Sequence, residues 1–500
     1  MLPRPRSRVS QATNTVGAAA PGATLDTPAA FAASRLTLLD SARLLVILAG
    51  AFMVVLDFFI VIVALPSIAH DIAATPGQLQ LIVAGYGIAN AAGLIAGGKL
   101  GDLFGRRQMF LAGMALFGAT SVACGLSTSG LMLVLMRFAQ GASGALLHPQ
   151  VLALLGLNFP GAKRARAFAA YAMAMGLAGV MGQLVGGALI ELDFASTGWR
   201  SCFFINAPIA LVAIVLGAQL LERDPLSTSA RRIDVRGMLL TAASLTCLIV
   251  PLTYGREALP VGWNVVLMVW ALALFLAFIA SQQRRSAAKL SVMIPRELAS
   301  VRLFRLGVGT VLVFYGGIAS FYFVLGLHLQ STLGASALQS GLVFAVLGAA
   351  FFAASMSGST LGRLFKRPLV ELGALVLILG HVAQGAVAMR GLGIGAMLPA
   401  LLIEGAGIGL IMAPLVSLAL SRTPPQHAGV AAGILSTMQS TGNALGVAAV
   451  GLSYIAGLWL PTGVSAAHAR FAGALGILAL LALAVWWLAR RIRVESERKA

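Results

Sequence analysis

Three charged side chains stand inside long apolar stretches of this sequence. Asp57 lies near the middle of the first such stretch, Arg137 lies in the fourth and Glu404 lies in the twelfth. A charge in an apolar environment needs a counter-charge, a proton or water to offset its lost hydration. A carboxylate can then take up a proton and later release it, whereas arginine stays charged and influences nearby carboxylates. The chemistry that this pattern suggests is proton binding.

Each of these residues also has a plainer structural explanation, which the sequence leaves open. Asp57 could be held permanently by hydrogen bonds between helices, Glu404 could belong to a structural pair, and Arg137 could extend to the outer membrane surface. His148 is a further candidate because Pro149 frees backbone groups beside it. A lone membrane histidine is more often a satisfied hydrogen-bond donor than a ligand. The same applies to the other histidines of the apolar stretches, His328 and His381.

The composition places most of the chain in a membrane. Of its 500 residues, 59% are hydrophobic and only 10% are charged, whereas a soluble domain of this size needs roughly 25% charged residues to cover its surface. The three cysteines follow no metal-binding spacing and imply neither a disulfide framework nor a zinc site. We therefore expect an all-α polytopic membrane protein without a metal or another cofactor.

Fourteen apolar stretches come close to or exceed the length of a membrane-spanning helix, which is about 20 residues. Most of the 35 Lys and Arg residues fall in alternate connecting segments. Because positively charged loops stay in the cytoplasm, this asymmetry predicts a plasma-membrane protein with both termini inside. It also explains the net charge of +19 without a nucleic acid. The predicted spans are 44–69, 80–98, 109–127, 131–156, 167–191, 201–221, 237–254, 263–283, 303–327, 338–361, 369–389, 393–420, 428–457 and 471–489.

The chain contains an internal repeat. The segment Gly97–Arg106 (GGKLGDLFGR) aligns with Gly358–Arg367 (GSTLGRLFKR), and the segment around Pro149 resembles the one around Pro414. A further match, in the same order, pairs Gly182 and Gly186 with Gly442 and Gly446. These landmarks indicate two homologous six-helix halves, and parallel halves of this kind place a substrate site between them near the middle of the membrane.

The repeat also predicts how the chain is divided. Two of the fourteen spans fall between the halves and form an insertion. The expected parts are a disordered cytoplasmic tail at 1–42, a six-helix bundle at 43–222, a two-helix insertion with cytoplasmic linkers at 223–300, a six-helix bundle at 301–490 and a cytoplasmic tail at 491–500.

A short polar connection, GKLGDLFGRR, follows the second span from Gly98 to Arg107. Topology requires only its cations, so it does not explain the acid Asp102, which the second-half copy replaces with Arg363. A helix N-terminus attracts a carboxylate, and a capping-box spacing opens the thirteenth span at 423–426 on the same face. We therefore expect Asp102 to dock near 423–429 when the inside is closed and to leave when it opens. The residues of this predicted latch are Gly98, Gly101, Asp102, Gly105, Arg106 and Arg107, with Arg106 bracing a neighbouring carboxylate or carbonyl.

Four groups of residues together resemble the major facilitator superfamily, and specifically its fourteen-span drug:proton antiporter group. They are the Gly98–Arg107 loop, Arg137 with Gln140, Gly141 and Gly144, the run Gly182–Gly187 (GQLVGG) followed by Gly198–Pro208 (GWRSCFFINAP), and Leu56–Asp57 with Val63–Pro66 (VALP). The resemblance covers about residues 43 to 490. The chain departs from the group at Phe59 and Ile62, where the family usually has Thr and Asn, and at Gln183, where it usually has Pro.

The resemblance implies a transport mechanism and the roles of several residues. It assigns Asp57 to proton coupling, Arg137 to biasing a nearby carboxylate, and the segment with Gly182, Gly186 and Gly187 to conformational control. Glu404 and His148 are further candidates for the proton or substrate pathway. The expected function is export of organic compounds, such as drugs or toxic amphipathic molecules, in exchange for protons by alternating access. The expected partners are a small-molecule substrate, protons and the lipid bilayer, for a monomer that works with or without accessory export proteins.

Other functions stay open at this point. The same fold could export one specific metabolite or antibiotic, or could import with protons, although the first span lacks the E-x-x-E-R motif of the fourteen-span peptide importers. A membrane scaffold that transports nothing would need neither a central acid nor the loop motif. We expect neither an enzyme nor a nucleotide-driven pump, because the Walker pattern is absent from the sequence.

Overall fold

The computed structural model is built from α-helices, and the residues that it describes form no β-strand. These residues are 37–159, 162–193, 196–222, 234–253, 261–288, 290, 292, 296–365, 368–420, 428–456 and 464–497. The helices longer than five residues are α2 Leu38–Asp71, α3 Pro76–Phe104, α4 Arg106–Gly125, α5 Gly130–Asn158, α6 Ala162–Leu192, α8 Asn206–Leu220, α9 Val235–Thr253, α11 Val261–Ala287, α13 Arg302–Leu327, α14 Ala337–Phe365, α15 Leu369–Met389, α16 Ile394–Leu420, α17 Ala428–Ala456 and α18 Val464–Glu497. Shorter helical pieces are η2 Gly198–Arg200, α7 Ser201–Phe204, α12 Arg296–Ser300 and the π-helical turn η3 His328–Thr332.

The expected all-helical membrane fold is confirmed. Within the described residues, 12 helices are long and apolar enough to cross a membrane, and 13 if α3, which bends by 48° around residue 95, counts as one span. The remaining predicted span, 428–457, coincides with α17. The number fourteen therefore stays a prediction, as do the domain boundaries, although a helix occupies every predicted stretch.

Local chemistry sets the helix ends that flank the site. Thr37 and Asp40 form a reciprocal capping box at the start of α2, in which the Thr37 hydroxyl accepts from the Asp40 amide at 3.1 Å. Thr75 and Gln78 do the same at the start of α3. Gly105 separates α3 from α4 with a φ of +91°, a conformation that favours glycine because it has no Cβ. This geometry explains the last glycine of the predicted latch.

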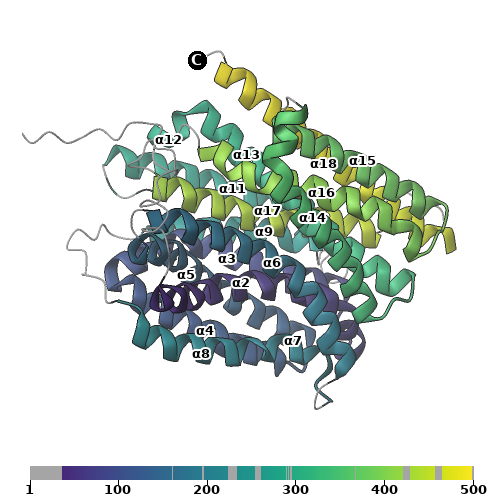
Figure 1. The fold of residues 1–500 in the computed structure, drawn as a ribbon, viewed down its shortest axis with the longest axis horizontal. Helices are drawn as coiled ribbons and strands as arrows, with labels where there is room; N and C mark the ends of the chain where they lie inside the picture. Colours follow the sequence, from purple (N-terminus) through teal and green to yellow (C-terminus); the bar gives the residue numbers. More distant parts are fainter. Residues whose placement is uncertain are drawn as a thin grey trace, which may run out of the picture.

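The two halves of the chain form the two halves of the molecule, from purple to teal and from green to yellow in Figure 1. Added Cβ atoms at Gly182 and Gly186 would lie within 3 Å of α2 atoms. Their predicted repeat mates, Gly442 and Gly446, pack as tightly against the α13 backbone. The repeated glycines therefore bring the fifth helix of each half onto the first helix of that half.

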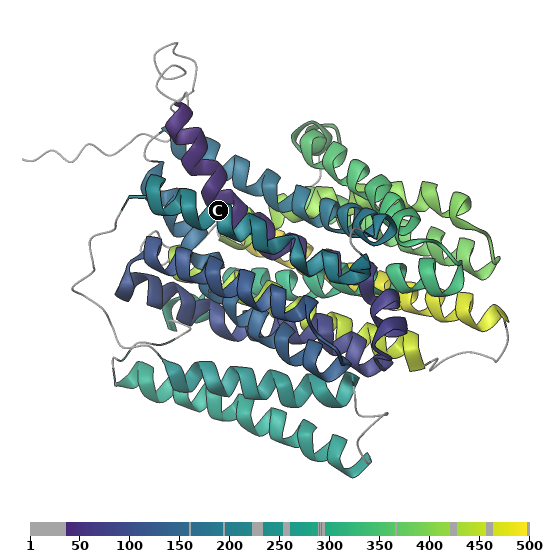
Figure 2. The same cartoon turned by 90° about the horizontal axis from the view of Figure 1, so that it is seen from below.

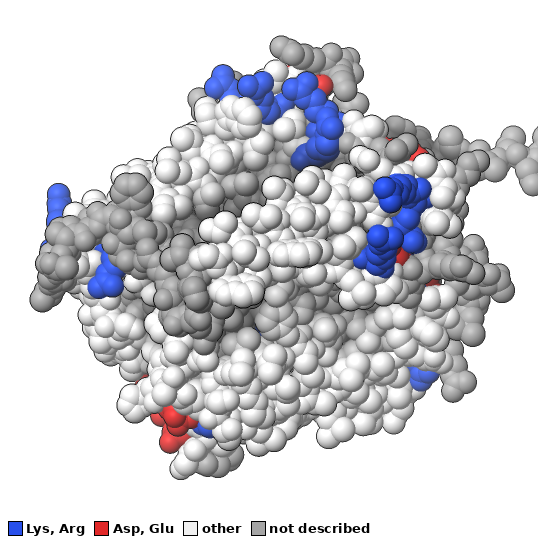
Figure 3. All heavy atoms as spheres, turned by 180° about the vertical axis from the view of Figure 1, so that it is seen from behind, with Lys and Arg blue, Asp and Glu red and all other residues white. Residues whose placement is uncertain are grey.

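The two helices between the halves, α9 and α11, pack against each other beside the bundle. Figure 2 shows them as the teal-green pair at its lower edge, and α9 also contacts α3 and α17. The outer surface suits a lipid environment: Figure 3 shows a broad face free of charged side chains, with charges gathered towards its margins. The α11 tryptophans Trp263 and Trp270 are among the large apolar side chains exposed on the surface.

The halves meet at the end of the bundle where α2 ends and α14 begins, which we call the closed end. There the Gln330 amide donates to the Val63 carbonyl across the seam at 2.9 Å. A Cβ at Gly341 would lie 2.8 Å from the Gln183 carbonyl oxygen, and one at Gly187 would overlap the carbonyl oxygen of Ala337. Glycine therefore permits direct backbone contact between α6 and α14 at this end.

The seam is looser towards the opposite end, which we call the open end. Met173 on α6 and Met356 on α14 are 66% and 83% exposed, although both helices pack closely nearer the closed end. The predicted topology places the closed end outside the cell and the open end in the cytoplasm. With that topology, the space between the halves would face the cytoplasm.

A Gly187→Val substitution tests the closed end. Because its side chain would overlap backbone, which cannot rotate away, we expect α6 and α14 to separate there. A Ser340→Cys reporter, at a fully buried α14 position, should then react with a maleimide at least about tenfold faster in purified protein. Gly433→Val is the matched control, because nothing lies within 4 Å of its added Cβ. Equal labelling rates in both variants would contradict direct contact between α6 and α14 at the closed end.

A neighbouring glycine pair tests helix packing inside the first half. A Cβ at Gly97 would overlap the Ala145 carbonyl oxygen, whereas one at Gly98 would only make ordinary contact with Pro149 at 3.7 Å. We expect Gly97→Ala to lower the free energy of unfolding by about 1–3 kcal/mol and Gly98→Ala to leave it unchanged or raised. Thermal unfolding of both purified variants measures this difference, and equal melting temperatures would refute it.

Candidate functional site

The Asp57 carboxylate lies inside the first half with no exposed surface. Its Oδ2 atom pairs with Nη1 of Arg137 on α5 at 2.5 Å. Its Oδ1 atom accepts two further bonds, from the side-chain amides of Gln140 and Asn206, each at 2.8 Å. Three donors from α5 and α8 thus surround one carboxylate on α2. The arrangement stabilises its charged form, because each donor compensates for lost hydration.

Arg137 is held as firmly as its partner. Its Nε atom donates to the Ile82 carbonyl at 3.0 Å, its Nη1 atom also reaches Gln140 at 2.8 Å, and its guanidinium lies 4.4 Å from the ring centre of Tyr86. Its Nη2 atom has no hydrogen-bond partner among the described residues. The side chain is fully buried, so the alternative in which Arg137 extends to the outer membrane surface is wrong.

Further polar groups continue the network towards α4. Asn206 donates to the Ser121 hydroxyl at 3.0 Å, and Ser121 donates to the Phe203 carbonyl at 2.8 Å. The Cys124 thiol lies 3.4 Å from Oε1 of Gln140. Gln140 and Asn206 were not among the predicted site residues, although both belong to the motifs that carry the resemblance. Their only separate signal was an amide in an apolar stretch.

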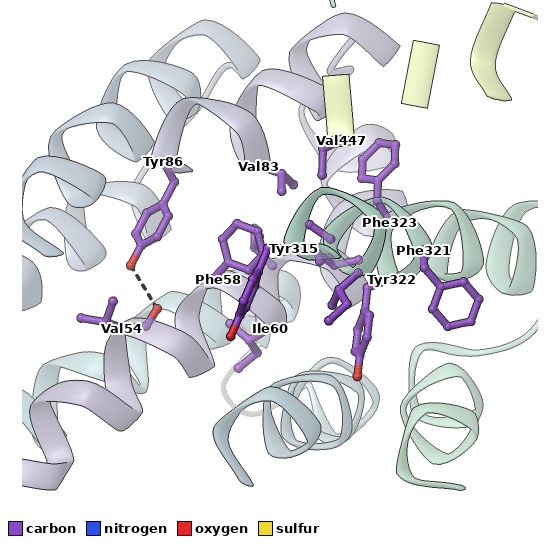
Figure 4. Packing of buried hydrophobic residues seen from close by; sticks show 14 of the residues in the cluster. Val54, Phe58, Ile60, Val83, Tyr86, Tyr315, Phe321, Tyr322, Phe323 and Val447 are labelled. Atoms are coloured by element: carbon purple, nitrogen blue, oxygen red, sulfur yellow. Dashed lines mark hydrogen bonds between the residues drawn. The ribbon is translucent and has the colours of Figure 1, made fainter. Parts of the chain in front are cut away.

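A cavity of about 960 Å³, including its open part, lies between the two halves. Neither Asp57 nor Arg137 lines it. Tyr86 separates them from it, because its ring contacts Arg137 and also lines the cavity, while its hydroxyl donates to the Val54 carbonyl at 3.0 Å (Figure 4). The ion pair therefore lies one side chain away from the cavity.

The cavity wall comes from four helices of each half, and no described residue in it is Asp, Glu, Lys or Arg. Its lining residues are Val54, Val55, Phe58, Phe59, Tyr86, Gly87, Asn90, Leu94, His148, Met175, Gly176, Gly179, Val180, Tyr315, Ile318, Tyr322, Phe351, Ile408, Met412, Ser436, Gln439, Ser440 and Asn443. Its mostly apolar lining, with few polar groups, is typical of sites for small organic molecules.

Two other predicted site residues lie apart from the ion pair. His148 does line the cavity, and its Nε2 atom lies 3.1 Å from the Tyr171 hydroxyl. Glu404 lies in the second half, where Oε1 pairs with Nδ1 of His381 at 2.7 Å and both side chains are buried. Its Oε2 atom has no hydrogen-bond partner within the described chain. The structure thus joins Asp57 to Arg137 but pairs Glu404 with His381, a histidine that was expected to be an ordinary hydrogen-bond donor.

The predicted latch lies at the open end. Asp102 is 54% exposed and pairs with Arg106 of the same segment at 3.0 Å. Arg107 donates to the Ala218 carbonyl of α8. A Cβ at Gly101 would overlap the Gln150 side chain. The expected docking of Asp102 near 423–429 involves residues 423–427, which lie outside the described part of the chain, so it stays a prediction.

Two of the three departures from the family motifs, Phe59 and Gln183, contact each other. The Gln183 amide on α6 donates to the Phe59 carbonyl on α2 at 2.9 Å, and α6 runs without a break from Ala162 to Leu192. The Phe59 ring lines the cavity, 4.9 Å from the ring centre of Tyr322 in the other half. Where the family usually has Thr and Pro, this chain therefore has an aromatic cavity wall and an unbroken helix.

Comparison with known proteins agrees with this architecture. A probable actinorhodin transporter of Streptomyces coelicolor is 37% identical over 420 residues, which cover 82% of this chain and 72% of that protein. A tetracenomycin C resistance and export protein of Streptomyces glaucescens is 33% identical over 82% of this chain and 75% of its own length. The crystal structure of the POT family transporter PepTSo superposes with a TM-score of 0.66 at 15% identity, covering 90% and 98% of the two chains, which shows the fold alone. The family model of the Major Facilitator Superfamily matches residues 47–447. The chain therefore belongs to the Major Facilitator Superfamily.

Proposed function

We propose that this protein exports small organic compounds across the plasma membrane in exchange for protons, by alternating access. The observation that carries the proposal is the buried Asp57–Arg137 pair, one tyrosine away from a cavity that both halves line. The relatives named for actinorhodin transport and tetracenomycin C export support export of an organic substrate. Proton entry would be driven by the pH gradient and by the membrane potential, which supplies about 2.3 kcal/mol per charge and 100 mV.

Proton coupling follows because a proton and the Arg137 guanidinium compete for the Asp57 carboxylate. In this structure, three donors bond to its carboxylate, and each of them favours the charged form. A proton on Asp57 removes the charge that Arg137 neutralises, so the guanidinium must find another partner. Tyr86 already contacts Arg137 and lines the cavity. Movement of Arg137 would therefore change the cavity wall, which links proton uptake to substrate release.

Contact between the halves at the closed end supports a state in which an exporter takes up its substrate from the cytoplasm. With both termini in the cytoplasm, the cavity faces the side from which substrate enters. Gly187 lets α6 and α14 meet at the outer end, and the Asp102 segment would close the inner end by docking near 423–429. We assign the Glu404–His381 pair to a second proton site in the other half, on the strength of the unpartnered Oε2 atom.

An importer of peptides has less support on the same fold. A peptide or another zwitterion needs fixed charges to bind its termini, and none lines the described cavity wall. Export of one compound and export of many remain two forms of the same proposal. Resistance of an efflux-deficient host to a panel of antibiotics and dyes distinguishes them, because one protected compound indicates a specific exporter.

Substitution of the ion pair tests proton coupling. Asp57→Asn leaves Arg137 buried without a counter-charge, and we expect it to lower the free energy of unfolding by about 3–5 kcal/mol. Asp57→Asn combined with Arg137→Gln removes both charges and should recover most of that stability. Neither variant should protect the efflux-deficient host. Thermal unfolding and the resistance panel measure the two effects.

The double variant separates a structural role from a coupling role. If Asp57 only holds helices together, the double variant folds and confers resistance like the unmodified protein. That outcome would overturn the coupling assignment. A folded but inactive double variant would support it.

A further inference from the structure

We propose that the cavity selects uncharged aromatic compounds that carry carbonyl or hydroxyl groups, and excludes organic cations and anions of similar size. The inference rests on the proposed export function and names the substrate class for the same cavity. Three properties of the wall carry it: its lack of fixed charge, its aromatic surfaces and a row of polar side chains on one helix.

The charge pattern excludes ionic substrates. Eight helices line the cavity, and their charged residues outside the first and last two turns are Asp57, Arg137 and Glu404. All three are fully buried away from the cavity, and each is bonded to a partner. A cation or anion between the halves would therefore lose hydration without gaining a counter-charge. An uncharged molecule avoids this cost.

Aromatic rings from both halves form part of the wall. Phe58 and Phe59 on α2 are 5.2 Å apart in an edge-to-face arrangement, and Phe59 lies 4.9 Å from Tyr322 across the seam. Tyr315 from α13 and Phe351 from α14 add to this surface. Figure 4 shows Phe58, Tyr315 and Tyr322 gathered where the two halves meet. Such surfaces favour aromatic ligands through stacking and edge contacts.

A polar row on α17 faces the same space. Four lining residues are spaced as one stripe of a helix, three, four and seven positions from the first. They are Ser436, Gln439, Ser440 and Asn443. The Ser440 hydroxyl donates to the side-chain oxygen of Asn90 across the seam at 3.0 Å. The amides of Gln439 and Asn443 have no side-chain hydrogen bond to other described residues.

The amides of Gln439 and Asn443 favour substrates that carry carbonyl or hydroxyl groups. An amide can donate to a carbonyl and accept from a hydroxyl, so it matches oxygen-bearing substrates without a charge. A purely apolar guest would leave both amides unsatisfied, which weakens binding. An aromatic substrate with carbonyl or hydroxyl groups can pack against the aromatic side chains of the wall and also form hydrogen bonds with the two amides.

Equilibrium dialysis of the purified full-length protein tests the inference with two planar dyes. We use 1,8-dihydroxyanthraquinone as the uncharged probe and ethidium as the cation, and measure both by absorbance. The unmodified protein should bind the anthraquinone at least about tenfold more tightly. Gln439→Leu should weaken anthraquinone binding about fivefold, which corresponds to the loss of one net hydrogen bond of about 1 kcal/mol. Gln439→Glu should strengthen ethidium binding by at least about tenfold, because it adds a counter-charge.

Thr437→Val is the matched control. Thr437 lies on α17 beside this row but does not line the cavity, and its hydroxyl bonds to the Gly433 carbonyl of its own helix at 3.0 Å. It should leave both affinities unchanged. Equal binding of the two dyes, binding of neither, or an unaffected Gln439→Leu variant would overturn the inference. Dialysis needs no proton gradient, so failure of proton coupling would appear only in the transport experiments.

Discussion

A charge buried inside a membrane protein needs a counter-charge close by, and the pairing of Asp57 with Arg137 meets this constraint. Both side chains are fully buried, so neither can be neutralised by solvent without movement of the helices around them. Amides from Gln140 and Asn206 complete the shell. The first half is therefore organised around a charge pair that is stable only while both partners stay charged.

This constraint can link proton binding at Asp57 to a change in the cavity between the halves. Proton binding at Asp57 breaks the match, and Arg137 contacts Tyr86, which belongs to the cavity wall. At one end of the seam between the halves, glycine allows backbone contact between α6 and α14. A change in the first half can thus alter both the cavity and the contact that keeps one end closed. We regard this coupling as the proposed mechanism, with the cavity chemistry deciding which molecules take part.

The membrane fold could be predicted from the sequence, and Asp57 and Arg137 could be selected as candidates, because apolar length and a charge within an apolar stretch are local properties. The predicted insertion helices at 237–254 and 263–283 correspond closely to α9 and α11. By contrast, the contact of Asn206 with Asp57 joins helices 149 residues apart, and the contact of His381 with Glu404 depends on how the consecutive helices α15 and α16 are rotated. The polar row on α17 could be recognised only once the rotation of that helix was known. Sequence periodicity gives the face of a helix but not its neighbour.

The most direct test of the central claim is whether Asp57 itself takes up a proton in the folded protein. Infrared difference spectra between neutral and acidic pH detect the carbonyl stretch of a newly protonated carboxyl group. If Asp57 is the coupling site, this band is present in the unmodified protein and in Glu404→Gln, and it weakens or disappears when Asp57→Asn is combined with Arg137→Gln. An undiminished band in that folded double variant would contradict the assignment.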